Sequence, residues 1–171
     1  MRRIAIALVT AAILGPACSA TGSPLSASAN ANGSAEPAAA TPSVMTSPSA
    51  ADLIYCADMT NRYRASIGLG PLVRSAALED FAAQAASIDA VAHSAHTHFA
   101  ATGGNGISSA ETEILWWRGF SVPAVIQRGL AEMWKVGPGG EHYDIMVGAF
   151  SEIGCGIAIN GLEVTVTQDF K

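Results

Sequence analysis

Basic residues are scarce and scattered in this sequence of 171 residues. It has nine Lys and Arg against 14 Asp and Glu, and two of the nine, Arg2 and Arg3, stand at the N-terminus. The other arginines are dispersed along the chain, at Arg62, Arg64, Arg74, Arg118 and Arg128. Proteins that bind nucleic acids neutralise phosphates with clustered basic side chains, so this distribution excludes nucleic acid as an expected partner.

Common catalytic signatures are also missing. The sequence has no glycine-rich phosphate-binding loop, no Gly-x-Ser-x-Gly elbow and no His-Glu-x-x-His zinc motif. It has no internal repeat that would indicate a solenoid or a propeller. These absences exclude the commonest nucleotide-dependent and esterase classes, and we expect a binding protein rather than an enzyme.

A short apolar run stands at the N-terminus. Residues 1–3 carry two positive charges, residues 4–14 are mostly apolar, and small residues lead to Cys18. The run is too short to cross a bilayer as a mature helix, so residues 1–18 are predicted to be a secretory signal peptide. Cys18 is the candidate lipidation site of a bacterial lipoprotein, although Gly15 stands where the lipobox usually has leucine. The alternative is ordinary cleavage after a small residue, which would release a soluble exported protein.

The next segment has the composition of a linker. Residues 19–50 consist mainly of Ser, Ala, Thr, Pro, Gly and Asn, with Glu36 as the single charge. They show no helical or strand periodicity and cannot bury enough apolar surface to offset the entropy of ordering, so they are predicted to be a flexible tether. The globular domain is then residues 51–171. A tether behind a lipidated cysteine would hold that domain away from a membrane surface.

The chain contains three cysteines. If Cys18 is lipidated, Cys56 and Cys155 remain as a pair in an oxidising compartment, and we predict a disulfide between them. On the chain-entropy model such a long closed loop stabilises a domain by about 4–5 kcal/mol. The alternative is a pair of buried free thiols.

Helices are predicted first and a hairpin last. Apolar residues recur at three- and four-residue spacing in residues 51–67 and 75–92, and again after Ser121, which an early Pro123 marks as a helix start. Residues 94–109 read as a loop, residues 111–117 as an extended segment, and residues 141–148 as a short helical turn. This order predicts an α+β layered domain and not a βαβ fold.

The closing hairpin is predicted from Asn160-Gly161, a type I′ turn signal between two alternating segments, residues 153–159 and 162–170. The alternation predicts one inward and one outward set of side chains. Leu162, Val164 and Val166 are expected to face the core, and Glu163, Thr165 and Thr167 to face solvent.

Histidines and glutamates form two groups along the sequence. The groups are His93, His96 and His98 with Glu111 and Glu113, and His142 with Glu132 and Glu141. Two imidazoles with one or two carboxylates and an open position suit Zn²⁺ or a similar divalent ion. The alternative is a set of solvated or hydrogen-bonded histidines, and spacing alone favours that alternative.

The order of short motifs resembles the CAP superfamily of cysteine-rich secretory, antigen 5 and pathogenesis-related proteins, also called SCP-like domains, in its bacterial exported form. The motifs are Asn61-x-Tyr63-Arg64, Gly68-Leu-Gly-Pro71-Leu72, an alanine-rich helix, a histidine, an acidic segment, Met133-Trp134, His142-Tyr143 and Gly154-Cys155-Gly156 before a final strand. The resemblance covers residues 51–171. It implies a three-layer α-β-α sandwich around a small antiparallel sheet.

The resemblance also implies a cleft with two histidines and two acidic residues, which holds a divalent metal in some members. His142 matches the second histidine, and His98 is our choice for the first, with His96 next. Glu111 matches the glutamate of the Gly-Glu-Asn segment, here Ala110-Glu111-Thr112.

The second acidic residue of that cleft departs from the pattern. Members often have a glutamate shortly after the tryptophan, where this chain has Lys135-Val136. Glu132 and Glu141 are weaker substitutes, as is Glu113. Because a ligand charge is lost and a like charge is added, we expect at best weak binding of a divalent ion such as Zn²⁺.

The expected function is that of an exported, lipid-anchored CAP-domain protein of the cell envelope. It would act as a monomeric binding or interaction module for a lipid or an envelope protein, with the membrane reached through the anchor. One alternative is a metal-dependent hydrolase or protease that uses His98, His142 and Glu111 to activate water. Another is a purely structural envelope domain with solvated histidines.

Overall fold

The computed structural model describes residues 48–171. The predicted signal peptide, the lipidation candidate Cys18 and nearly all of the predicted tether lie outside the described residues. Within residues 48–171, none of the helices has the length and apolar character needed to cross a membrane.

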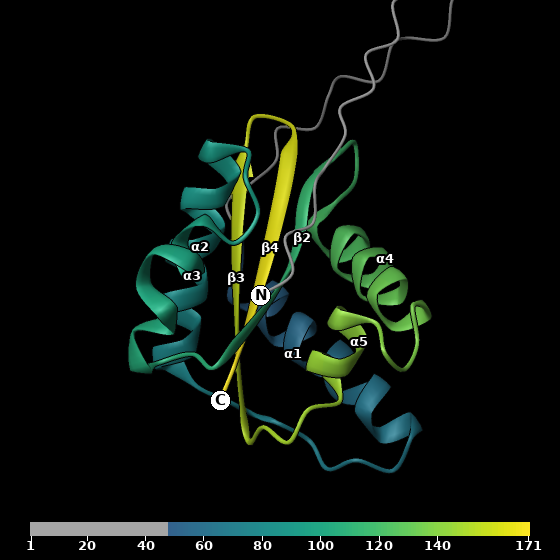
Figure 1. The fold of residues 1–171 in the computed structure, drawn as a ribbon. Coiled ribbons are helices and arrows are strands. Elements are labelled where there is room, and N and C mark those ends of the chain that lie inside the picture. Colours follow the sequence, from purple (N-terminus) through teal and green to yellow (C-terminus); the bar gives the residue numbers. More distant parts are fainter. Residues whose placement is uncertain (1–47) are drawn as a thin grey trace, which may run out of the picture. The chain divides into compact units, whose positions relative to one another are not determined.

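The described chain forms three layers (Figure 1). Its elements are α1 (Ala50–Ser66), β1 (Val73–Arg74), α2 (Ala76–Ala92), α3 (Thr97–Thr102), the 3-10 helix η1 (Gly103–Gly106), β2 (Ala110–Arg118), α4 (Val122–Lys135), α5 (Glu141–Met146), β3 (Glu152–Asn160) and β4 (Glu163–Phe170). The sheet order is β1-β3-β4-β2, antiparallel except for the two-residue β1, which pairs parallel with β3. Figure 1 shows α2 and α3 on one face of the sheet and α1, α4 and α5 on the other. The predicted α+β three-layer sandwich is therefore confirmed.

Serine residues precede the starts of α1 and α4. The Ser49 hydroxyl accepts a hydrogen bond from the Asp52 backbone N–H at 3.2 Å, and the Asp52 carboxylate accepts one from the Ser49 N–H at 2.9 Å. This capping box satisfies two backbone donors that a helix start otherwise leaves free. Ser121 precedes α4, and Pro123 lies in its first turn.

One face of the sheet forms an apolar core with α1 and α4. Its fully buried side chains include Val125, Ile126, Leu130, Met146, Ile153, Val164, Val166 and Phe170. Cys56 of α1 and Cys155 of β3 form a disulfide with Cα atoms 6.4 Å apart, which confirms the predicted pairing. The disulfide covalently joins the first helix to an inner strand of the sheet.

The other face of the sheet is also buried, which corrects part of the hairpin prediction. Thr165 and Thr167, expected to face solvent, are 0% exposed because α2 covers them. Close contact is permitted by Gly154 and Gly156: a Cβ at Gly156 would lie 2.0 Å from the Ala82 carbonyl carbon. A sheet with helices on both faces buries both sets of alternating side chains, so alternation alone cannot identify a solvent face.

The hairpin turn also lies one residue later than predicted. Asn160 pairs with Glu163, so the two turn residues are Gly161 and Leu162 rather than Asn160 and Gly161. Gly161 has φ +63°, a value that glycine adopts without steric cost. Leu162, expected to face the core, is therefore at the turn and 51% exposed.

Candidate functional site

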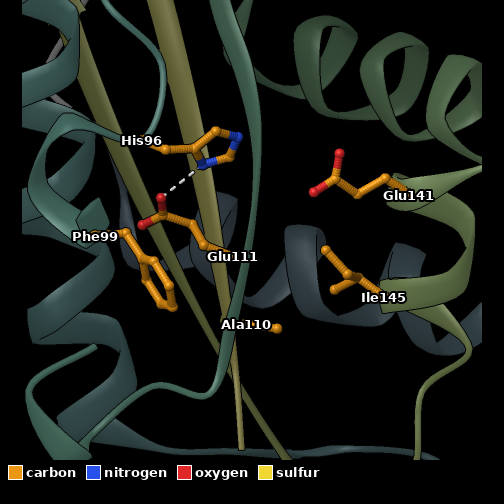
Figure 2. Close-up of a pocket in the computed structure, with 6 residues that line it drawn as sticks. All are labelled: His96, Phe99, Ala110, Glu111, Glu141 and Ile145. Carbon is orange, nitrogen blue, oxygen red and sulfur yellow. Dashed lines mark hydrogen bonds and ion pairs between the residues drawn. The ribbon is translucent and has the colours of Figure 1, made fainter. Parts of the chain in front are cut away.

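A cavity of about 250 Å³ lies beside β2, the edge strand of the sheet. Its lining residues are His96, Phe99, Ala110, Glu111, Glu141 and Ile145. They come from three separate parts of the chain, namely the α2–α3 segment, β2 and α5 (Figure 2). Figure 2 shows the Glu141 side chain directed from α5 toward the pair formed by His96 and Glu111.

His96 is held in place by two carboxylates. Its Nδ1 lies 2.8 Å from Oε1 of Glu111, and its backbone N–H donates to Oε2 of Glu113 at 2.7 Å. The residue has φ +55°, a left-handed conformation that costs a side-chain-bearing residue roughly 1–2 kcal/mol. Both interactions oppose that cost, so the geometry of His96 is determined by its acidic partners.

Those partners also change the ionisation of His96. The hydrogen bond with Glu111 raises the pKa of the imidazole, burial opposes the rise, and the charges of Glu113, Glu111 and Asp89 add to it. The ring is 41% exposed while the Glu111 side chain is 1% exposed. The half-exposed imidazole of His96, which can take up a proton, therefore covers the buried carboxylate of Glu111.

A layer of buried carboxyl groups lies beneath this pair. Asp89 of α2, Glu111 and Glu113 of β2 and Asp169 of β4 are all at most 7% exposed. Glu111 is directly opposite Asp169 in the β2–β4 ladder, and Glu113 is opposite Thr167, whose hydroxyl donates to it at 3.0 Å. The layer occupies the face of the sheet that α2 covers.

Burial dominates the ionisation of two members of this layer, Glu113 and Asp169. It raises the pKa of Glu113 to about 8, with further contributions from Asp89 and Glu111, and raises the pKa of Asp169 to about 7. Neither carboxyl oxygen of Asp169 has a hydrogen-bond partner among residues 48–171. The nearby Ser108 hydroxyl donates instead to the carbonyl of Ala110 at 3.0 Å. Close carboxyl groups in a buried layer cannot all carry a charge, so part of the layer is protonated at neutral pH.

The α5 helix is positioned by contacts from α1 and α4. Trp134 of α4 packs between Tyr63 and Tyr143, with ring centroids 5.0 Å and 4.7 Å away. The buried Arg64 guanidinium donates to the carbonyls of Met146 and Gly148 at 2.9 Å and 3.0 Å. A six-residue helix is not stable alone, so these contacts are what place its side chains at the cavity.

The first histidine of the site is not where we expected it. His98 points into the protein: it is 9% exposed, and its ring packs on Phe81 at a centroid distance of 4.6 Å. Its backbone N–H donates to Asp89 at 3.1 Å. The structure therefore brings His96, our second choice, to Glu111.

The second histidine is also displaced. His142 does not line the cavity, whereas Glu141, one residue earlier, does. Residues four apart share a helix face, and Glu141 and Ile145 are such a pair, a signal in the sequence that we did not use. Glu132 is exposed on α4, where it lies 3.8 Å from Lys135, and it takes no part in the cavity.

The residues present fit a metal ion poorly. Among residues 48–171 one group of possible ligands has its atoms within 4.8 Å of one another, and it consists of His96, Glu111 and Glu113. Both oxygens of Glu113 already accept hydrogen bonds, its pKa is raised to about 8, and Glu141 lies outside the group. A divalent ion needs deprotonated ligands, whereas the raised pKa values of Glu113 and His96 favour their protonated forms, so the set disfavours a bound ion.

Comparison with known proteins gives one family. The model of the cysteine-rich secretory protein family, CAP, matches residues 57–170. No curated protein sequence matches this chain.

Similar solved structures come from two bacteria and a hookworm. An outer surface protein from Borrelia burgdorferi is 18% identical, with a TM-score of 0.53 over 71% of this chain and 93% of that chain. A cysteine-rich secretory protein from Staphylococcus aureus is 16% identical, with a TM-score of 0.48 over 71% of this chain and 39% of that one. The hookworm platelet inhibitor is 14% identical, with a TM-score of 0.45 over 69% of this chain and 67% of that one.

Proposed function

Because this chain belongs to the cysteine-rich secretory protein (CAP) family, we propose that it is an exported, lipid-anchored envelope protein that binds a ligand in the His96–Glu111–Glu141 cavity. One observation carries the proposal: a buried carboxylate, Glu111, is paired with a half-exposed imidazole on the wall of a cavity built from three separate elements. Concave sites with a few fixed polar groups and apolar walls are typical of ligand binding.

The lining residues favour binding over covalent chemistry. They include no serine, threonine or cysteine that could serve as a nucleophile, and they hold a single imidazole. The acidic and apolar walls are held by α5 and β2, whose positions depend on packing and on the Arg64 hydrogen bonds. A preformed site of this kind loses little conformational entropy when a ligand enters.

Export is supported by two independent features. The first 18 residues have the charge and hydropathy pattern of a signal peptide, with Cys18 at its end. The Cys56–Cys155 disulfide belongs to the class of crosslinks that persist in oxidising compartments. A domain with an acidic cavity, held on a tether outside the membrane, would meet its ligand in the envelope.

The cavity can be tested as a binding site by photocrosslinking in cells. A photoreactive residue at Ile145, inside the cavity, should capture one defined envelope component, while one at Val73, 67% exposed on the opposite edge strand β1, should not. The Ile145 adduct should be lost in a Glu111→Gln background. Equal capture at both positions, or capture indifferent to Glu111→Gln, would contradict the proposal.

A second candidate is a metal-dependent hydrolase that uses the same cavity. It is favoured by one observation, the ligand atoms of His96, Glu111 and Glu113, which lie within 4.8 Å of one another. On that hypothesis the purified protein contains stoichiometric Zn²⁺, and His96→Ala abolishes both metal content and turnover. His142→Ala, a substitution outside the cavity, is the matched control. We expect elemental analysis to find less than one ion per chain, and a full equivalent that is lost only in His96→Ala would favour the hydrolase.

A further inference from the structure

Exposed apolar residues gather at one end of the sheet. Arg118 pairs with Glu163 in the β2–β4 ladder, so the end of β2 and the β3–β4 turn lie side by side, at the top of the view in Figure 1. The end of α2 joins them, because His93 Nε2 lies 2.9 Å from a Glu163 carboxylate oxygen. Leu162 in the turn is 51% exposed, and Val91 of α2 is 76% exposed. We call this surface the tip; it consists of residues 91–93, 116–120, 128 and 161–163.

Two consecutive tryptophans of the tip lie on opposite faces of the sheet. A bulge in β2 just before Trp117 leaves Trp116 with φ +58°, a left-handed conformation that strains a residue with a side chain. The Trp116 ring stacks on His93 with centroids 5.1 Å apart, and its Nε1–H donates to the Asp89 carbonyl at 3.3 Å. The Trp117 ring packs on Phe120 at 5.9 Å. Both indoles are half-buried, so each also presents part of its surface at the end of the sheet.

The tip is basic although the chain as a whole is acidic. Arg118 is 69% exposed, and the Arg128 guanidinium lies over the Phe120 ring, 4.7 Å from its centroid. Glu163 is the single acidic residue in the segments that form the tip, and Arg118 Nε donates to it at 2.9 Å. Arginines beside exposed aliphatic and aromatic groups are typical of surfaces that lie at a bilayer interface, where indoles sit among the head groups and basic side chains contact anionic lipids.

The chain that precedes the domain is long enough to bring the tip to a membrane. Residues 19–47 separate Cys18 from the described domain, and a chain of that length spans at most about 100 Å when fully extended. An acyl anchor at Cys18 therefore keeps the domain within that distance of the lipid head groups. This raises the effective concentration of the surface contact, so a contact too weak to retain a free domain can still orient an anchored one.

We propose that the tip rests on an anionic bilayer and orients the domain on it. Leu162 and the two indoles enter the head-group region, and Arg118 and Arg128 contact lipid phosphates. The cavity stays free in this orientation, because Glu111 lies near the start of β2 and Arg118 at its end, roughly 20 Å along the strand. The inference rests on the proposed lipid anchor and adds to it a second, oriented contact.

The test is quenching of tryptophan fluorescence by lipids brominated on their acyl chains. The acylated full chain, with Trp134→Phe to leave only the two tip indoles, is reconstituted in vesicles of phosphatidylcholine and phosphatidylglycerol. We expect quenching, because indoles at the interface lie next to the upper acyl carbons. Chains that float with the vesicles but are not quenched overturn the tip contact and leave the anchor standing, whereas chains that do not float overturn both. Ligand capture at Ile145 tests the cavity separately.

Paired variants separate the tip from the rest of the surface. Leu162→Ser should reduce quenching, whereas Val73→Ser, 67% exposed at the other end of β3, should not. Arg128→Gln should lower the ratio of docked to free domains about fivefold on these vesicles, whereas Lys135→Gln at the far end of α4 should leave it unchanged. Equal effects within either pair would contradict the proposal. A photoreactive residue at Leu162 should label lipid, and a protein adduct there, a second copy of this chain included, would overturn the membrane as the partner.

Discussion

At the scale of single residues, the unusual feature is a layer of carboxyl groups inside the fold. Asp89, Glu111, Glu113 and Asp169 all lie between the sheet and α2, where ordinary cores have apolar side chains. Charged carboxylates are costly in such a place, and protonation lowers that cost. The layer therefore couples the stability of the domain to pH.

The direction of this coupling follows from the pKa shifts. Burial raises the pKa of Glu113 to about 8 and that of Asp169 to about 7, against about 4 in the unfolded chain. The folded state then holds more protons, so the free energy of unfolding falls as pH rises from about 4 to about 8. The raised pKa of His96 acts in the same direction, because its stabilisation is complete below about 6.5 and is lost as pH rises through the folded value.

Asp169→Asn tests this coupling, because asparagine resembles the protonated carboxyl group and does not titrate. The gain in stability over the wild type should grow from pH 4 to pH 7 and reach on the order of 4 kcal/mol at neutral pH. Denaturant unfolding at a series of pH values measures the difference. Asp58→Asn, at an exposed residue of α1, is the control and should follow the wild type at every pH. A constant difference between Asp169→Asn and wild type would refute the coupling.

Site residues were only partly predictable from the sequence. Glu111 was assigned from its segment, and the structure places it in the cavity. His96 was ranked below His98 because the order of residues does not show the left-handed backbone conformations that the chain takes at His93 and His96. Glu141 was ranked below His142 because the two residues are adjacent in a short helix, and the sequence alone does not show which of them faces the cavity.

At the scale of elements, the contact between α2 and β3 determines how tightly two layers pack. A Cβ at Gly156 would lie 2.0–2.3 Å from backbone atoms of Ala82 and Ala83, which cannot move independently of the helix. Gly156→Ala should therefore destabilise the domain by about 3 kcal/mol, at the upper end for overpacking. Thermal and denaturant unfolding measure the loss. Gly70→Ala, where no atom lies within 4 Å of the added Cβ, should change stability by less than about 1 kcal/mol.

Local signals predicted these elements well. Capping residues and apolar spacing placed α1, α2 and α4 within a few residues, and the hairpin of β3 and β4 was recognised from its turn glycine and alternation. The burial of Thr165 and Thr167 was not predicted, because a two-residue period identifies two faces but not which of them is covered. The covering helix is distant in sequence, and only the tertiary fold shows that its alanines meet the strand glycines.

At the scale of the whole molecule, the proposed location depends on Cys18. Cys18→Ser should move the protein from the membrane fraction to the soluble exported fraction, because the acyl chains that hold a lipoprotein can no longer be attached. Ser19→Ala, at the adjacent position, is the matched control and should stay with the membrane. Fractionation followed by immunodetection measures both. An unchanged distribution of Cys18→Ser would defeat the lipid-anchor hypothesis.

The Cys56–Cys155 disulfide has a mechanical consequence for a protein pulled at its ends. The bond closes a loop over a sequence separation of 99 residues, and His96, Glu111 and Glu141 all lie inside that loop. Tension applied at Ser49 and Lys171 runs along α1 to Cys56, crosses the disulfide and continues from Cys155 through β3 and β4. The loop itself carries no covalent load, so the cavity residues are in the part of the chain that stretching cannot extend while the bond is oxidised.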